Sequence, residues 1–209
     1  LLDEVLAGQS PEIQRFLLRT SILERLCAPL CDALLGDSEE PERPNEDHLA
    51  HPDGTFASQS TRILEHLDRA NLFLVSLDDE RTWYRYHHLF ADLLRTQLQK
   101  TLGTEGVAQL YVRASDWHGA YGSILEAISY AALASDDARV ERYIEQNYLE
   151  LVDRGEQAWL RFWVDKLSRD LVYSRPRLCI YEAYSHSWFG ELDEADRLLD
   201  VAEQGLKSD

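Results

Sequence analysis

The stretch WYRYHHLFADLLR (83–95) follows closely on NLFLVSLDDE (71–80). Aromatic and β-branched residues on both sides of an acidic run, Asp78 to Glu80, predict a short β-hairpin that turns at the acids. Apolar residues then recur at helical spacing from His88 to Gln99. We therefore expect a hairpin, with strands at 72–77 and 82–87, that leads directly into a helix, with paired histidines at the junction.

Three further helices are expected before this hairpin. Ser10 followed by Pro11 is a strong helix start, and this helix extends to Thr20 with Ile13, Phe16 and Leu17 on one face. A second helix spans Ala28 to Leu35 with Gly36 as its C-cap, and a third spans Thr61 to Ala70. In the third helix and in the helix after the hairpin, the expected inward residues are Ile63, Leu64, Leu67, Leu89, Phe90, Leu93, Leu94 and Leu98.

Residues 37–60, between the second and third helices, have a different composition. They include three prolines and seven acids and almost no large apolar residue. We expect a long, mobile, solvated loop. Its His48 and His51 leave open a zinc site with Cys27 and Cys31, although thiols buried on a helix face are the simpler interpretation.

From about Glu105 onward only helical patterns occur. The expected helices are Val107 to Tyr121, Ser123 to Ala134, Ala138 to Val152, Glu156 to Leu167, Arg177 to Phe189 and Leu192 to Leu206. The stretch EAYSHSWFGELDEADRLLDVAEQ (182–204) looks like a tetratricopeptide-type (TPR-like) hairpin. We expect the aromatic residues of this half to form its core, and a partner surface is the alternative; they are Trp159, Phe162, Trp163, Tyr181, Tyr184, Trp188 and Phe189.

Composition excludes several classes of function. The net charge is −17 with no evident basic patch, so direct contact with nucleic acid is not expected. The chain has no apolar run long enough to cross a membrane, and its three cysteines are expected to be free thiols in the cytoplasm. It has no methionine and ends within a helical pattern, so we expect an internal piece of a longer protein.

Four segments in order resemble the MalT-like regulators, which are large bacterial signal-transducing ATPases with a LuxR-type DNA-binding domain at the C-terminus. They are SPEIQRFLLRTSILERLCAPLCDALLG (10–36), ILEHLDRANLFLVSLDDERTWYRYHHLFADLLRTQL (63–98), residues 113–134, and SRPRLCIYEAYSHSWFGELDEADRLL (174–199). The resemblance implies a mainly α fold. A winged-helix domain with a small β-hairpin would occupy residues 1–100, and a TPR-like superhelical region, truncated at its end, would occupy residues 101–209.

The resemblance also implies a site. In the wider group of such switch ATPases, a histidine after the hairpin contacts the β-phosphate of ADP within a Met-His-Asp signature. That signature aligns with Tyr86, His87 and His88, so His87 is the candidate phosphate sensor, with ATP or ADP as cofactor in the full-length parent. A structural role for the two histidines, as a helix cap or at a domain interface, stays open. The phosphate-binding pattern GxxxxGK[ST] does not occur here, so neither a cofactor nor catalysis is expected in this chain itself.

The expected function is that of an internal regulatory fragment that couples nucleotide state and inducer sensing to activation of transcription. Its expected partners are the parent's own ATPase domain, the downstream sensor and DNA-binding domains, and an inducer or protein on the helical-repeat surface. No membrane partner is expected. The alternative is a helical-repeat scaffold that binds a peptide or protein without any ATPase.

Overall fold

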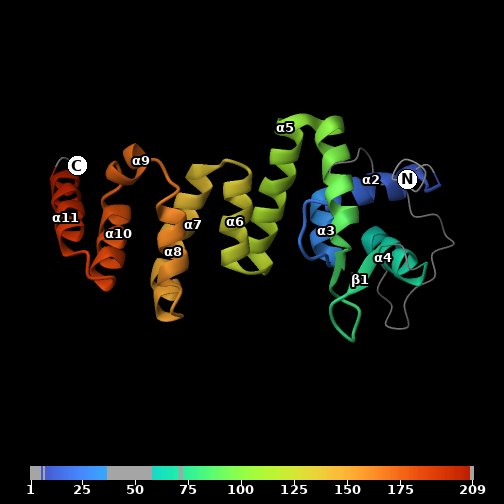
Figure 1. Cartoon of the computed structure of the whole chain (residues 1–209), viewed down its shortest axis with the longest axis horizontal. Helices are drawn as coiled ribbons and strands as arrows, with labels where there is room; N and C mark the ends of the chain where they lie inside the picture. Colours follow the sequence, from blue (N-terminus) through green and yellow to red (C-terminus); the bar gives the residue numbers. More distant parts are fainter. Residues whose placement is uncertain (1–5, 7, 37–57, 71–72, 208–209) are drawn as a thin grey trace. The chain divides into compact units, whose positions relative to one another are not determined.

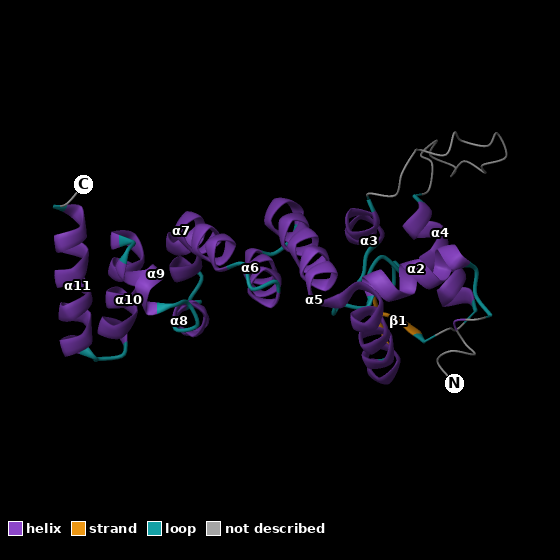
Figure 2. Ribbon diagram, turned by 90° about the horizontal axis from the view of Figure 1, so that it is seen from above, coloured by secondary structure: helices purple, strands orange, loops and turns teal. Residues whose placement is uncertain are grey.

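A computed structural model describes residues 6, 8–36, 58–70 and 73–207. The chain forms two compact units, Leu1–Gly122 and Ser123–Asp209. The described residues are mainly helical and contain one two-stranded sheet (Figure 2). This agrees with the expected mainly α fold class. No described helix is both long enough and apolar enough to cross a membrane.

Among its described residues from Pro11 onward, the first unit has three helices, a hairpin and a long final helix (Figure 1). Their bounds are α2 Pro11–Thr20, α3 Ala28–Leu35, α4 Gln59–Arg69, β1 Leu74–Ser76, β2 Tyr84–Tyr86 and α5 His88–Tyr121. The predicted start of α2 is confirmed, since the Ser10 hydroxyl accepts a hydrogen bond from the Ile13 N–H at 3.3 Å. Gly36 follows α3 as predicted, but with a φ of −64° it is not in the left-handed conformation.

Helix α4 begins two residues before the predicted start at Thr61. Ser58 is its N-cap, and the Ser58 hydroxyl accepts from the Thr61 N–H at 3.2 Å. The last residues of the expected 37–60 loop are therefore helical, because a serine cap is available earlier than the apolar pattern begins. The rest of that loop, with His48 and His51, lies outside the described residues.

The hairpin is antiparallel and shorter than predicted. Its register places Leu74 opposite Tyr86 and Ser76 opposite Tyr84. Leu26 pairs with the other edge of β2, since its N–H donates to the Tyr84 carbonyl at 2.7 Å and its carbonyl accepts at 2.8 Å. The connection between α2 and α3 thereby holds β2 from the side opposite β1.

The core of the first unit explains which side of α5 is buried. Fully buried leucines come from several elements, and they include Leu17, Leu26, Leu30, Leu34, Leu67, Leu94 and Leu98. On α5, Phe90 and Ala91 are also buried, whereas Leu89 is 62% exposed and Leu93 is 45% exposed. The predicted inward orientation of Leu89 and Leu93 is wrong, because the apolar sector of α5 is wider than the surface that packs on α2 and α3.

Helix α5 replaces two predicted helices with one element that contains a kink. Gly103 interrupts it with a φ of 65° and a ψ of −177°, a combination that only glycine adopts without strain. Beyond the kink, the Arg113 guanidinium donates to the carbonyl of Leu34 at 3.2 Å and to that of Gly36 at 3.0 Å. These bonds fasten the second half of α5 to the end of α3.

The second unit consists of helices only among its described residues. Their bounds are α6 Ile124–Leu133, α7 Asp137–Asp153, α8 Gln157–Val164, α9 Arg169–Tyr173, α10 Pro176–Trp188 and α11 Leu192–Leu206. Helix α9 was not predicted, and its start is capped by the Ser168 hydroxyl. The helices α6 and α7 pack as one hairpin and α10 and α11 as another (Figure 1).

Two buried carboxylates fasten the ends of α9. Glu141 of α7 is 7% exposed and accepts from Arg175 Nε at 2.5 Å. Glu182 of α10 is 2% exposed and pairs with Arg169. A buried carboxylate is costly unless it is paired, so these arginines define how α9 joins its neighbours.

Candidate functional site

The paired histidines lie between β2 and α5. Their imidazole rings stack with centroids 4.7 Å apart, and both side chains are exposed. The His87 N–H donates to the Phe73 carbonyl at 2.8 Å, and the His87 carbonyl accepts from Phe90 and Ala91 in the first turn of α5. The backbone of His87 is thus fixed by both the hairpin and the helix, while its side chain remains available.

The first turn of α5 has no side-chain cap. His87 occupies the N-cap position, and its side chain makes no capping hydrogen bond to the first N–H groups of the helix. Such groups carry partial positive charge and favour an anion. The predicted use of these histidines as a helix cap is therefore not what their side chains do.

A cavity of about 290 Å³ opens beside the histidines. Four basic residues line it, and the full lining is Leu23, Glu24, Val75, Arg85, Tyr86, His87, His88, Ala91 and Arg95. Arg95 is held in place, because its Nε donates to the Ser21 carbonyl at 2.8 Å and its Nη1 pairs with Asp92 at 3.3 Å. Glu24 is the one acid in this lining.

Sequence reasoning singled out the histidines but missed the two arginines. Arg85 lies on the strand directly before them, and Arg95 lies two turns further along α5. Only the hairpin register and the helix start bring these four side chains to one cavity. A set of guanidinium and imidazole groups at a helix N-terminus can bind an oxyanion such as phosphate.

The aromatic residues around the site set its position. Phe73 has a φ of 57°, unusual for a residue other than glycine, and its ring stacks on Phe90 at 4.4 Å. Tyr86 is buried, and its hydroxyl bonds Thr20 Oγ1 at 2.7 Å. The backbone immediately before and after His87 is therefore anchored in the core.

The acids and thiols near the hairpin have structural roles. Asp78 accepts from the Thr82 and Trp83 N–H groups and from the Thr82 hydroxyl, so it closes the turn. Cys27 and Cys31 are buried free thiols, and burial raises the pKa of each. Among the described residues no group of three metal-ligating side chains occurs, and the zinc alternative falls on histidines outside them.

The aromatic residues of the second unit divide into two groups. Trp159 and Trp163 pack against the core, and Tyr181 stacks on Tyr148 with centroids 3.7 Å apart. The core interpretation is wrong for four other aromatic residues, whose side chains are substantially exposed. They are Phe162 (53% exposed), Tyr184 (43%), Trp188 (63%) and Phe189 (47%). The positions of these aromatic residues in the sequence could not separate the two groups, because they do not show which helix faces are covered by neighbouring helices.

Comparison with known proteins gives a consistent result. Residues 2–105 match the family model of the MalT winged helix domain. The serine/threonine-protein kinase PknK of Mycobacterium tuberculosis is 32% identical over 186 residues, which are 89% of this chain and 15% of that protein. The HTH-type transcriptional regulator MalT of Serratia proteamaculans is 29% identical over 207 residues, 99% of this chain and 21% of that protein.

MalT of Yersinia pestis is 28% identical over the same length. The chain thus spans about a fifth of the length of the MalT relatives and less of PknK. The family model and these relatives confirm the resemblance to MalT-like regulators that the sequence analysis drew from the hairpin, the paired histidines and the following helix. The chain therefore belongs to the MalT-like regulator family, whose winged helix domain it carries in its first half.

Proposed function

We propose that this chain is an internal regulatory part of an ATP-dependent MalT-type transcriptional regulator. In this proposal it couples the nucleotide state of an ATPase domain, and inducer sensing further along the protein, to activation. Family membership and the basic cavity beside His87 support it. The cavity is the observation that carries the proposal, because its guanidinium and imidazole groups at the start of α5 are suited to bind phosphate.

His87 is the proposed phosphate sensor. Its imidazole lies on an uncapped helix start, and Arg85, His88 and Arg95 line the same cavity. The cofactor is ATP or ADP bound by the parent's ATPase domain, and this chain adds contacts to its phosphates. A state that makes these contacts gains affinity for the nucleotide and is therefore favoured when nucleotide is bound.

The exposed leucines at the start of α5 give this proposal a docking face. Leu89 and Leu93 are one helical turn apart, and Val75 of β1, which lines the same cavity, is 39% exposed. These leucines lie about 160° around α5 from Ala91 and Arg95, which line the cavity, so they form a separate apolar face that a neighbouring domain can cover. We assign this face to the parent's own ATPase domain.

Catalysis has no part in the proposed function of this chain. The sequence lacks the GxxxxGK[ST] pattern, and the kinase relative is matched over only 15% of its length. Direct contact with DNA is also left to a downstream domain, because the hairpin tip carries Asp78, Asp79 and Glu80. The proposed location is the cytoplasm.

The experiment is ADP binding by calorimetry on the full-length parent protein, with His87→Ala compared against wild type. We expect at least about a tenfold loss of affinity, since a hydrogen bond to a charged phosphate contributes about 1.5–3 kcal/mol. The matched control is His66→Ala, because His66 is an exposed histidine on α4 of the same unit. Unchanged ADP affinity and unchanged basal transcription would show that the histidines are structural.

The second candidate is a helical-repeat scaffold that acts without nucleotide. The exposed apolar side chains of the second unit favour it. A parent that does not bind ADP at all, yet retains a protein partner through residues 123–209, would select this alternative. In either case we propose that the second unit carries the binding site for an inducer or a protein partner.

A further inference from the structure

Phe73 lies where the hairpin departs from regular geometry. The register of the two strands pairs Val75 with Arg85. A regular hairpin, extended by two residues, would therefore pair Phe73 with His87, and the side chains of both pairs would point to the same face of the sheet. Because that face borders the basic cavity, the phenyl ring of Phe73 would lie against the His87 imidazole.

The observed backbone of Phe73 avoids this arrangement. Its φ of 57° lies in the left-handed region, which is rare and strained for a bulky side chain. In this conformation the phenyl ring stacks on the ring of Phe90, with centroids 4.4 Å apart and planes 18° apart. Phe90 is 6% exposed, so the stack fixes Phe73 to the buried side of α5. Among the described residues that line the cavity, Phe73 does not occur.

The strain at Phe73 differs from that at the other two described residues, besides glycines, that have a positive φ. Arg81 (55°) lies between the two strands and Ser135 (58°) lies between α6 and α7, so each belongs to a turn. Phe73 lies directly before β1 and contacts both β2's end and α5. Backbone strain persists only where the surrounding contacts hold it, and it is typical of functional sites.

Phe73, His87 and Phe90 form a closed set of contacts. The Phe73 carbonyl accepts from the His87 N–H at 2.8 Å, and the His87 carbonyl accepts from the Phe90 N–H at 2.9 Å. The stack of the two phenyl rings closes the set. An extended Phe73 would continue β1 with its ring on the opposite face, so the stack that supports both hydrogen bonds would be lost.

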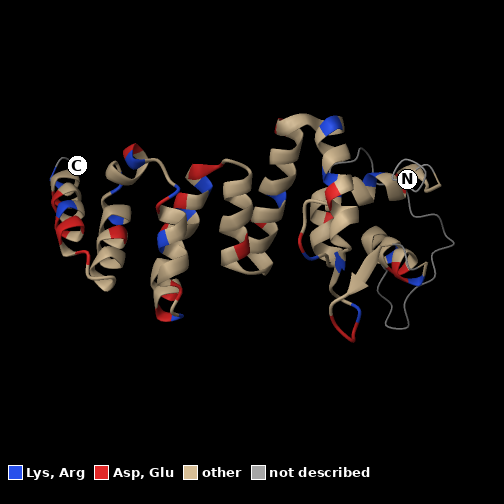
Figure 3. Ribbon diagram, in the orientation of Figure 1, with Lys and Arg blue, Asp and Glu red and all other residues tan. Residues whose placement is uncertain are grey.

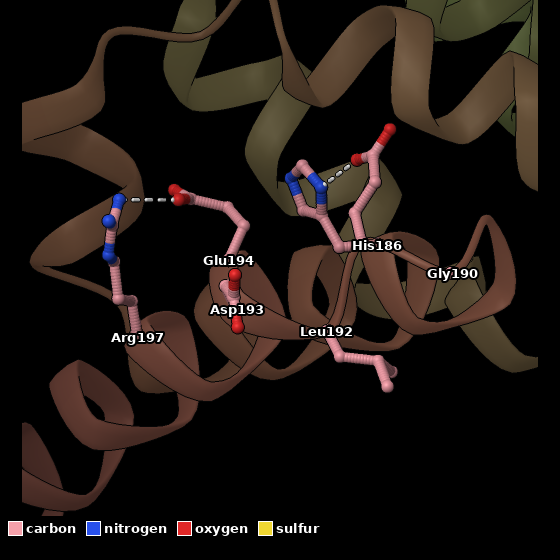
Figure 4. Close-up of a pocket in the computed structure, with 7 residues that line it drawn as sticks. His186, Gly190, Leu192, Asp193, Glu194 and Arg197 are labelled. Carbon is pink, nitrogen blue, oxygen red and sulfur yellow. Dashed lines mark hydrogen bonds and ion pairs between the residues drawn. The ribbon is translucent and has the colours of Figure 1, made fainter.

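The backbone alone determines where the His87 side chain lies. In the second unit, the His186 imidazole is fixed by its own hydrogen bond, because its Nδ1 lies 2.5 Å from a carboxylate oxygen of Glu191 (Figure 4). The His87 imidazole stacks on the exposed ring of His88 and makes no hydrogen bond or ion pair with the residues that the structure describes. The reach of its ring nitrogens into the cavity therefore depends on the bond between the His87 N–H and Phe73.

We propose that Phe73 is a positioning residue of the phosphate site. Its left-handed backbone holds the His87 N–H and keeps the phenyl ring off the His87 side chain, so that the imidazole faces the cavity. This inference rests on the proposed function, in which His87 contacts a phosphate of the nucleotide. It adds that affinity for the phosphate is set from outside the cavity, by a residue that does not touch the ligand.

The test is ADP binding by calorimetry on the full-length parent protein with Phe73→Ile. A β-branched side chain disfavours a positive φ, so this variant should lose about tenfold in ADP affinity, as His87→Ala should. Phe73→Tyr keeps the ring, and its hydroxyl can reach solvent because Phe73 is 39% exposed, so it should bind as wild type does. The matched control is Ser135→Ile, which creates the same backbone conflict in the second unit and should leave ADP affinity unchanged.

Two further measurements separate positioning from general loss of structure. In the double variant Phe73→Ile with His87→Ala, the two losses of affinity should not add, because Phe73 acts through His87. Hydrogen exchange followed by mass spectrometry should show faster exchange at residues 86–90 in Phe73→Ile and unchanged exchange in α7.

The outcomes distinguish this inference from the proposed function. Additive losses, equal losses in Ser135→Ile, or unchanged exchange at residues 86–90 would overturn the inference. A loss in His87→Ala without one in Phe73→Ile would overturn it too and would leave the proposed function standing. Unchanged ADP affinity in His87→Ala would overturn both.

Discussion

The Tyr86 hydroxyl joins two parts of the chain that are 66 residues apart. It lies 2.7 Å from Thr20 Oγ1, and Thr20 itself donates to the Phe16 carbonyl at 2.7 Å. Because the single Thr20 hydroxyl hydrogen is used there, Tyr86 must be the donor to Thr20. Burial raises the pKa of Tyr86, so the phenol stays neutral and keeps its hydrogen. This one bond ties the strand before His87 to the end of α2.

Tyr86→Phe should therefore lower the free energy of unfolding by about 1 kcal/mol, the usual contribution of a buried hydrogen bond. Thr20→Val should have a similar cost, and the double variant should cost less than the sum, because both single changes remove the same bond. Urea unfolding of the four proteins measures this. Tyr121→Phe is the control, since Tyr121 is 80% exposed. Additive effects of the two changes would contradict the assigned bond.

At the scale of the element, the hairpin depends on Asp78. Its carboxylate accepts from the Thr82 N–H at 2.9 Å and the Trp83 N–H at 3.2 Å, and Ser76 Oγ donates to its carbonyl at 2.7 Å. The hydrogen bond from the Thr82 side chain is the main cause that lowers the pKa of Asp78. The acidic turn seen in the sequence is thus an internal cap of the hairpin.

This lowered pKa predicts a pH dependence. The folded-state pKa is below the unfolded value of about 3.9, so the contribution of Asp78 to stability is complete above that value and is lost as the pH falls through the folded pKa. Asp78→Asn should lower the urea midpoint at pH 7 more than at about pH 2.5. Asp79→Asn, an exposed neighbour in the same turn, should show no such difference. A constant effect of Asp78→Asn at both pH values would contradict the charged cap.

At the scale of the whole molecule, the net charge of −17 determines which macromolecules the chain can bind through electrostatic attraction. Binding to duplex DNA depends on cations that displace counterions from phosphate. The basic side chains around His87 form one small cavity, whereas acids occupy the hairpin tip and α11 (Figure 3).

The chain should consequently show no binding to a random-sequence duplex in fluorescence anisotropy, even at low salt of about 50 mM, where nonspecific binding is strongest. A lysine-rich peptide added to the same protein serves as the positive control for electrostatic association. Saturable DNA binding that weakens steeply with salt would contradict this prediction and would point to a DNA-binding role for the winged helix.

Local signals in the sequence were enough to predict most of the helices, the hairpin and the family. Ser10 with Pro11, the apolar spacing of α4 and α11, and the histidine junction act through neighbouring residues, so they can be read without knowing the rest of the fold. Segments with weaker local signals were missed or misjudged. These include the short helix α9 and the strand ends next to the turn.

Only the tertiary structure decided which apolar residues are buried and which basic residues lie together at one cavity. Leu93 and Leu94 have the same chemistry and adjacent positions, yet one is 45% exposed and the other is buried, because only one faces the neighbouring helices. Arg85 and Arg95 join the histidines only through the hairpin register and the direction of α5. Burial and proximity depend on contacts between distant segments, and those contacts exist only once the chain has folded.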